Sequence, residues 1–292
     1  MRLPLAVFTV LSLTLFHLPT ASANSQWKPL FDQKLSSWEV WIGVPHVGVT
    51  GLPAGTPMSP DGHKGTPLGL NNDPKHVFSM ITEGGEPVLH ISGEIFGGLT
   101  TRSSFSNYHL RTQFKWGQLK WEPHLHDRRD NGILYHCTGP HGAFWNAWKR
   151  CVEFQVQEED MGDLFLLSGT RADVPVTLVD KRSFYDPAGE LKPFGEGAPS
   201  GSPSHLKGNF EKPNGEWNTL EIYTLGRNAV HVVNGKIVMV LHNTANVIDH
   251  TEIPLDGGQL QIQCEGAEAY YRRMEIQPIT AFPEEIKKAA GL

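Results

Sequence analysis

Residues 151–157 read Cys-Val-Glu-Phe-Gln-Val-Gln, and from Val152 onward apolar and polar side chains alternate. Successive side chains of a β-strand point to opposite faces of its sheet. The two valines and the phenylalanine therefore share one face, which we predict to be the core. Glu153, Gln155 and Gln157 share the other face. The stretch predicts a strand that is apolar on one side and carries a carboxylate and two amides on the other.

Strand-length segments recur along the rest of the chain, and turn residues separate them. The segments are Val88–Ile91, Gly97–Thr101, Tyr108–Trp116, Gly132–Cys137, Cys151–Gln157, Asn218–Leu225, Ala229–Val233, Lys236–Leu241, Gly258–Cys264 and Tyr270–Ile276. Asn234-Gly235 lies between two of them, and this pair favours the type I′ turn of a hairpin. With no alternation of strands and helices, we predict an all-β fold, a two-sheet antiparallel jelly-roll sandwich.

Two long stretches and one short helix complete the predicted fold. Val44–Lys75 and Asp186–Gly215 are rich in Gly and Pro and lack a useful period. We expect long loops there, at one side of the sandwich, which either wall a binding cleft or are plain surface excursions. Pro283–Ala290 predicts a helix, with acidic residues in its first turn and Gly291 as its stop.

Composition excludes several classes of protein. The 292 residues are 39% hydrophobic and only 19% charged, with 30 Gly and 21 Pro, which is unlike a helical bundle or a coiled coil. The net charge is −6 and no long run of Lys and Arg occurs, so we expect no nucleic-acid partner. The sequence has no Gly-rich phosphate loop, G-x-S-x-G or H-E-x-x-H motif, and we expect no organic cofactor.

The N-terminus predicts export. Arg2 precedes an apolar run, and Ala21-Ser22-Ala23 is a cleavage signal, so we interpret residues 1–23 as a signal peptide. The mature chain, residues 24–292, is then a single secreted or periplasmic domain with no stable membrane insertion. Its cysteines, Cys137, Cys151 and Cys264, allow one disulfide at most, and the sequence leaves the pairing open.

A second row of polar side chains strengthens the prediction of a binding site that includes Glu153, Gln155 and Gln157. Gln259, Gln261, Gln263 and Glu265 share a parity that opposes apolar neighbours. Carboxylate and amide rows on two strands suit sugar hydroxyls or a hard cation, although a solvated sheet face is the commoner use of one such row.

Other side chains near these rows are candidates for the same site. His136 could bind a metal or move a proton, although a lone His is more often structural. His124 and His126 are weaker metal candidates because Pro123 and the charged run that follows favour a loop. Asn131, Trp145 and Trp148 are candidate sugar contacts, since flat rings stack on pyranose faces; the rings could equally fill the core.

Several blocks, in order, resemble the 3-keto-disaccharide hydrolase family. They are the opening Trp27–Asp32, the strand Asp130–Tyr135, the strand Arg150–Val156 with Gly162-Asp163, and then Gly215–Asn218, His231–Gly235, Leu260–Gly266 and Tyr271-Arg272. The resemblance covers nearly the whole mature chain. It implies a concanavalin A-like sandwich, exported by bacteria, that acts on glycosides whose C3 hydroxyl has been oxidised to a ketone.

The chemistry that this implies is elimination. A C3 ketone acidifies the C2 proton, so a base can form an enolate that expels the C1 substituent, after which water adds. A divalent cation or a guanidinium would stabilise that enolate.

The resemblance also implies site residues. Glu153, Gln155, Gln263 and Arg272 match the family's motifs, whereas Glu265 stands where the family usually has His and His136 where it usually has Arg. We expect Glu153, Glu265 and His136 to supply the base and the ligands of a divalent metal. We expect Gln155, Gln157, Gln263 and Arg272 to orient the sugar and its ketone.

Two alternatives stay open at this point. The sandwich could be a non-catalytic carbohydrate-binding module, because fold does not determine function. It could also be a conventional glycosidase that uses a pair of carboxylates, with Glu153 paired to Glu265 or Asp163.

Overall fold

The structure is a computed structural model, and it describes residues 26–201 and 204–292. The predicted signal peptide lies outside the described residues. In chain order the elements are β1 (Lys28–Pro29), β2 (Trp38–Ile42), β3 (Gly69–Leu70), β4 (Phe78–Glu83), β5 (Glu86–Ile91), β6 (Gly97–Ser106), β7 (Tyr108–Lys120), β8 (Asp130–Thr138), β9 (Arg150–Gln157), β10 (Leu164–Leu167), β11 (Thr170–Val179), β12 (Arg182–Tyr185), β13 (Glu190–Gly195), β14 (Asn218–Leu225), β15 (Asn228–Val233), β16 (Lys236–Ile248), β17 (Thr251–Pro254), β18 (Gly257–Cys264), β19 (Ala267–Pro278) and α1 (Glu284–Ala290).

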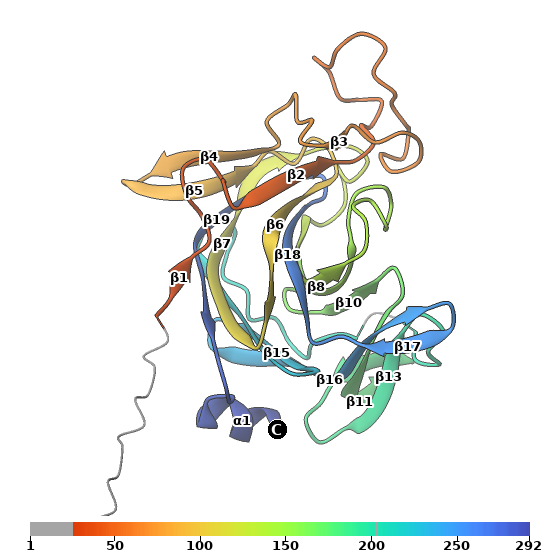
Figure 1. The fold of residues 1–292 in the computed structure, drawn as a ribbon, viewed down its shortest axis with the longest axis vertical. Coiled ribbons are helices and arrows are strands. Elements are labelled where there is room, and N and C mark those ends of the chain that lie inside the picture. Colours follow the sequence, from red (N-terminus) through yellow and green to blue (C-terminus); the bar gives the residue numbers. More distant parts are fainter. Residues whose placement is uncertain (1–25, 202–203) are drawn as a thin grey trace, which may run out of the picture.

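The strands form two antiparallel sheets, which confirms the predicted all-β sandwich (Figure 1). The larger sheet has twelve strands with a central path β12-β11-β16-β15-β14-β7-β19-β5-β4. The smaller sheet has seven strands in the order β10-β9-β8-β18-β6-β2-β3. Strands β8, β9 and β18, which carry the two predicted polar rows, are therefore neighbours in the smaller sheet.

The main core joins side chains of both sheets. Val152 and Phe154 of β9 belong to one buried cluster with Phe114 of β7, Ile222 of β14 and Tyr271 of β19, and each is 0% exposed. The alternation along β9 thus places its apolar face against the larger sheet, as predicted. The polar face of β9 points away from that sheet, toward the outer side of the smaller one.

The predicted turn and helix are confirmed in detail. Asn234 and Gly235 have φ values of 48° and 76°, the left-handed pair that a type I′ turn needs, and they join β15 to β16. Helix α1 starts directly after Pro283 and ends at Gly291, whose φ is 70°. The helix contacts β16 at the lower end of the sandwich (Figure 1).

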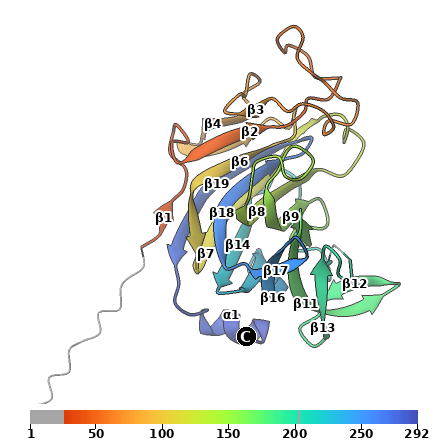
Figure 2. The ribbon, with the colours of Figure 1, turned by 45° about the vertical axis from the view of Figure 1, so that its right-hand side comes forward.

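The two long loops are less irregular than we predicted. The first contains β3, which pairs with the edge strand β2. The second contains β13, which pairs with β11 along six residue pairs. Strands β11, β12, β13 and β17 extend from one end of the sandwich, where Figure 2 shows them at the lower right.

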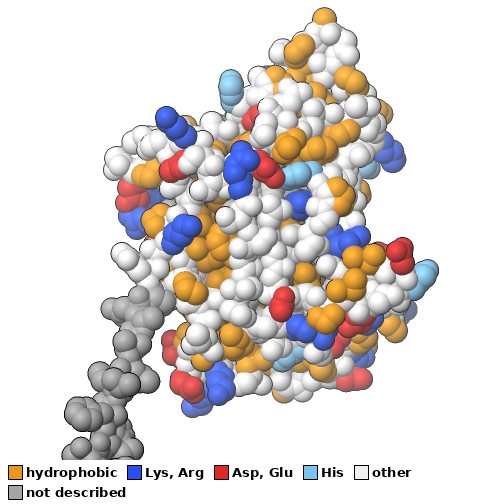
Figure 3. Space-filling view, viewed as in Figure 1, with side chains coloured by type: hydrophobic (Ala, Val, Ile, Leu, Met, Phe, Trp, Pro, Cys, Tyr) orange, Lys and Arg blue, Asp and Glu red, His pale blue; other side chains and the backbone are white. Residues whose placement is uncertain are grey.

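The surface shows no concentration of positive charge on the face drawn in Figure 3, where Lys and Arg side chains are scattered. Cys137, Cys151 and Cys264 are buried free thiols. Within the described ranges, no helix has the length and apolar character that crossing a bilayer requires.

Candidate functional site

Carboxyl and amide side chains gather on the outer side of the smaller sheet. Glu153 and Gln155 come from β9, Gln263 comes from β18, and Glu265 follows β18 directly. All four are buried, with exposed fractions between 2% and 8%. We call these four residues, together with Asp130 at the start of β8, the carboxyl cluster.

Gly132 of β8 has no side chain, and this leaves room for side chains of the two neighbouring strands to approach each other. It lies between the two rows, opposite Gln155 in the β8–β9 register. A Cβ atom built on Gly132 would lie 2.3 Å from Glu153 Oε1 and 2.7 Å from Gln263 Oε1. The oxygens of two strands therefore meet in the space that a side chain on the third strand would fill. Its φ is not in the left-handed region, so the glycine is required here for space.

Amide nitrogens of the cluster are turned toward its carboxyl groups. Gln263 Nε2 donates to Glu265 Oε2 at 2.7 Å, and Gln157 Nε2 donates to Asp130 Oδ2 at 2.5 Å. Gln155 Nε2 makes a longer bond of 3.4 Å to the same Asp130 oxygen. The amide oxygens of Gln155 and Gln263 are buried without a hydrogen-bond partner, and that of Gln263 lies against Gly132.

Burial dominates the electrostatics of the cluster. It raises the pKa of Asp130 to about 7. It also raises the pKa of Glu153 well above its usual range, and the nearby Asp130 raises it further. Burial, then Asp130 and Glu153, raise the pKa of Glu265 in the same direction. The carboxyl groups are thus close enough for each to oppose ionisation of the others.

The structure does not bring three of the predicted residues into this cluster. His136 lies inside the sandwich, with its ring edge-on to Tyr108 and Tyr135. Asn131 is 0% exposed and faces the core. Arg272 lies on the outer side of the larger sheet, where its Nε donates to Gln113 and its guanidinium lies over the ring of Trp217.

The physical reasons are local. A β-bulge between Tyr135 and Thr138 breaks the alternation of β8, and His136 adopts a φ of 52° there. The side chain of Tyr271 points into the core, so its neighbour Arg272 must point outward.

The two predicted tryptophans differ in exposure. Trp148 is 1% exposed, and its Nε1 donates to the carbonyl of Gly97. It packs in a second apolar cluster with Leu134 and Cys151, on the same side of the smaller sheet as Glu153. Trp145 is 41% exposed and stacks on His63, with ring centroids 4.8 Å apart. Only Trp145 presents substantial ring surface to solvent.

The predicted metal ligands are only partly assembled. Glu153 and Glu265 interact, whereas His136 lies elsewhere. Among residues 26–201 and 204–292, no group of three or more His, Cys, Asp and Glu side chains could hold a metal. Asp163, the other carboxylate considered for a catalytic pair, accepts from His205 at 2.6 Å and from the backbone of Leu206 at 2.7 Å.

Two residues near Glu265 were not predicted there: Asp130 was no site candidate, and His124 was only a weaker metal candidate. Asp130 shares the parity of Gly132, so extending the predicted strand by two residues would have placed it in the row. His124 Nδ1 pairs with Asp127 at 2.8 Å, and its Nε2 lies 3.8 Å from Glu265 Oε1. No short-range sequence signal connects His124 with Glu265.

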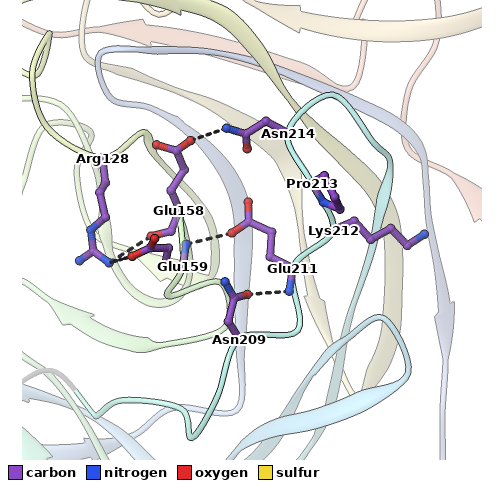
Figure 4. Close-up of a pocket in the computed structure, with 8 residues that line it drawn as sticks. All are labelled: Arg128, Glu158, Glu159, Asn209, Glu211, Lys212, Pro213 and Asn214. Carbon is purple, nitrogen blue, oxygen red and sulfur yellow. Dashed lines mark hydrogen bonds and ion pairs between the residues drawn. The ribbon is translucent and has the colours of Figure 1, made fainter.

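A hollow of about 450 Å³ lies at the end of β9 that carries Gln157 (Figure 4). Its lining combines Arg128, Glu158 and Glu159 with residues of the loop that precedes β14, including Glu211. Glu211 Oε2 accepts from the backbone nitrogen of Glu159 at 2.9 Å. None of the residues that line the hollow belongs to the carboxyl cluster.

Comparison with known families and structures adds one strong match. Residues 26–277 match the model of the 3-keto-alpha-glucoside-1,2-lyase-like domain family. No curated protein matches the chain significantly.

Solved structures resemble the chain only distantly. A candidate glycosyl hydrolase from Parabacteroides distasonis is 18% identical, covering 87% of this chain and 100% of its own, with a TM-score of 0.46. A β-glucanase from Bacillus licheniformis is 11% identical, with coverage of 88% and 99% and a TM-score of 0.41. The carbohydrate-binding module CBM66 from Bacillus subtilis is 10% identical, with coverage of 68% and 91% and a TM-score of 0.39. These likenesses are too distant to assign a function.

Proposed function

This chain belongs to the 3-keto-alpha-glucoside-1,2-lyase-like domain family, and we propose from that premise that it cleaves 3-keto-glycosides by elimination. Membership supports a carbohydrate-related function. The observation that carries the finer proposal is the carboxyl cluster, where acid–base groups and sugar-binding amides converge over Gly132. Elimination next to a ketone needs groups of both kinds.

Glu153 is the residue we assign to the C2 proton. Its Oε1 has no hydrogen-bond partner and faces the space over Gly132. A carboxylate whose pKa is raised by burial is a stronger base, once ionised, than one in water. The C2–H electron pair then forms the C1=C2 double bond, and the C1–O bond breaks toward the leaving oxygen.

Glu265 is the residue we assign to the leaving group. Burial raises the pKa of this carboxyl and so favours its protonated form, whose proton goes to the departing oxygen. Gln155 and Gln263 offer amide oxygens to the sugar hydroxyls. Water then adds across the double bond if the product is to be fully hydrolysed.

A chromogenic assay tests this function. Nitrophenyl 3-keto-α- and 3-keto-β-glucosides would be compared with their 3-hydroxy parents, using the mature chain and its Glu153→Gln variant. We expect release only from the keto substrates, and loss of turnover in the variant. The matched control is Glu159→Gln, which should remain active. It removes a carboxylate just after the end of β9, on a side chain that is 74% exposed.

The other outcomes would contradict the proposal. Release from the 3-hydroxy parents as well would favour a conventional glycosidase. Binding of an unoxidised glycan with no release from any substrate would favour a binding module. A fully active, folded Glu153→Gln protein would remove Glu153 from the mechanism.

We also propose that the protein is exported, on the basis of the leader that the sequence predicts. N-terminal sequencing of protein recovered from the periplasm or the medium should start near Asn24. Intact chain beginning at Met1 and confined to the cytoplasm would contradict export.

A further inference from the structure

Two of the three cysteines lie opposite each other on adjacent strands. Cys137 belongs to β8 and Cys151 to β9. The regular register of this pair of strands ends at Tyr135, opposite Val152, and resumes at Thr138, so Cys151 is the residue of β9 that lies opposite the bulge. We propose that Cys137 and Cys151 form a disulfide that joins β8 to β9 in an oxidising compartment.

The bulge in β8 turns Cys137 toward Cys151. In a regular strand Cys137 would share the face of Tyr135, which belongs to the main core. A β-bulge re-aims side chains, and here both cysteines belong to the second apolar cluster, with Trp148. Both thiols therefore lie on the outer side of the smaller sheet.

The separation of the two residues suits a disulfide. Residues that lie opposite each other in antiparallel strands have Cα atoms about 4.5–5.5 Å apart, and disulfides span about 4.4–6.8 Å. Burial raises the pKa of the Cys151 thiol, and a hydrogen bond with Cys137 raises it further. The two sulfur atoms are thus close to each other while both thiols are free.

Cys264 shows the ordinary role of a buried cysteine. It is 0% exposed and belongs to the main core, where it packs as a small apolar side chain. Its neighbours Gln263 and Glu265 point to the outer side of the smaller sheet, so the sheet lies between Cys264 and the other two thiols. The structure therefore favours one pairing and leaves Cys264 as the remaining thiol.

A small oxidant has a route to the pair. Cys137 lines a hollow of about 580 Å³ together with Gly139 and Lys149. Lys149 Nζ donates to the carbonyl of Gly139 at 2.6 Å. The positive charge of Lys149 acts on Cys151 against the larger effects of burial and Cys137, and it lowers the pKa of that thiol. A nearby ammonium group favours the thiolate, which is the form that attacks a disulfide.

The link forms by thiol–disulfide exchange with a small disulfide, for which oxidised glutathione is the probe. The thiolate of Cys137 attacks one sulfur of glutathione disulfide, and the other half leaves as a thiolate. The thiolate of Cys151 then attacks the Cys137 sulfur, and the second glutathione leaves. The cysteines lose two protons and two electrons in total, and the oxidant becomes two molecules of reduced glutathione.

The disulfide would stabilise the part of the sheet that carries the carboxyl cluster. Glu153 follows Cys151 by two residues and shares its face of β9, and Gly132 belongs to the strand of Cys137. A link between these strands also closes the loop that carries Trp145 and Trp148. Closing a loop of this length reduces the freedom of the unfolded chain and so favours the folded state.

Refolding of the reduced mature chain from urea, in a mixture of reduced and oxidised glutathione, tests the pairing. Thiols that remain free are blocked with N-ethylmaleimide in denaturant, and the intact mass is measured. We expect one blocked cysteine, against three in chain treated with dithiothreitol. Digestion with trypsin without reduction should join residues 130–149 to residues 151–171.

Three variants identify the pair. Cys137→Ala and Cys151→Ala should each form no link within the chain, whereas the matched control Cys264→Ala should form the same link as the wild type. Thermal unfolding gives a second readout. Dithiothreitol should lower the unfolding temperature of the oxidised wild type and of Cys264→Ala by about 5 °C or more, and should leave that of Cys137→Ala unchanged.

Several results would overturn the disulfide. A link that involves Cys264 would do so, as would glutathione that stays attached to Cys137 while Cys151 remains free. Because refolding itself could fail, chain that was never unfolded is incubated in the same glutathione mixture. Three blocked cysteines in both samples would overturn the proposal.

The disulfide and the proposed export can fail separately. Formation of the link in the cell rests on export, whereas its formation in glutathione does not. A link in glutathione by a chain that stays in the cytoplasm would support the pairing and contradict export. Exported chain with three free thiols, which also forms no link in glutathione, would retain export and overturn the pairing.

Discussion

The hydroxyl of Tyr271 in the larger sheet donates a hydrogen bond of 2.6 Å to Asn131 Oδ1 in the smaller sheet. The amide of Asn131 in turn donates to the backbone carbonyl of Gln263 at 2.6 Å. Both side chains are 0% exposed. These two hydrogen bonds connect the sheets across the core and end at the backbone of Gln263, a member of the carboxyl cluster. They therefore hold β8 and β18 at a fixed distance from the larger sheet.

We predict that Tyr271→Phe destabilises the protein. Asn131 Oδ1 would lose its donor, and a buried acceptor left unpaired costs about 1–3 kcal/mol in the free energy of unfolding. Urea denaturation followed by tryptophan fluorescence would measure the change.

Tyr108→Phe is the matched control, because Tyr108 is also buried, at 1% exposed, and its hydroxyl has no partner. Removing that hydroxyl should leave stability unchanged or raise it. Equal losses of unfolding free energy in the two variants would show that the Tyr271–Asn131 hydrogen bond does not stabilise the protein specifically.

We predict that Gly132→Ala disrupts the carboxyl cluster. The new Cβ atom would collide with Glu153 and Gln263 oxygens, and both side chains would have to move. Overpacking of this kind costs about 1–3 kcal/mol of stability. Turnover of the keto-glucoside should fall by about a hundredfold or more, because small displacements of reacting groups have effects of that size.

Gly98→Ala is the control that separates the loss of stability caused by overpacking from the loss of turnover caused by displacing Glu153 and Gln263. A Cβ atom on Gly98 of β6 would lie 2.4 Å from the amide of Gln261, a similar collision in the same sheet. Urea denaturation should show comparable losses of stability in both variants. Loss of turnover in both to the same degree would contradict a specific role for the space over Gly132.

The alternation of apolar and polar residues along the sequence was sufficient to predict the main features of the sheets. It identified the apolar face of β9 and the face that Glu153 and Gln155 share. The tight turn at Asn234-Gly235 was equally predictable, because its residues have a local conformational preference. Each of these features depends on residues that are neighbours in sequence.

Prediction failed where a feature depends on how distant strands meet. The bulge after Tyr135 turned His136 inward, and no residue type in the stretch signals a bulge there. The parity of Tyr271 and Arg272 shows only that they point to opposite sides. Which of them faces the smaller sheet is decided by packing in the core between the two sheets, where Tyr271 contacts Asn131. Strand β13 was missed because pairing with β11, rather than any alternation of its own, makes it a strand.

His136 leads to a prediction about acid stability. Burial lowers the pKa of His136 to about 3, and neither of its ring nitrogens has a hydrogen-bond partner. An imidazole in the unfolded chain titrates near 6.5. Between these values the unfolded chain binds a proton that the folded protein excludes, so the free energy of unfolding falls as the pH falls. The contribution of His136 is fully present above about pH 6.5 and is lost progressively toward pH 3.

We therefore expect His136→Phe to be less sensitive to acid than the wild type. Phe keeps a ring against Tyr108 and Tyr135 and cannot take up a proton. Between pH 7 and pH 5 the wild type should lose about 2 kcal/mol more stability than the variant. Urea denaturation at the two pH values measures this difference, and any constant cost of the larger ring cancels from it. The control is His250→Gln, at an exposed turn, whose stability should change with pH as that of the wild type does. Parallel pH profiles of stability for His136→Phe and the wild type would contradict the prediction, because they would show that His136 binds protons equally in the folded and unfolded states.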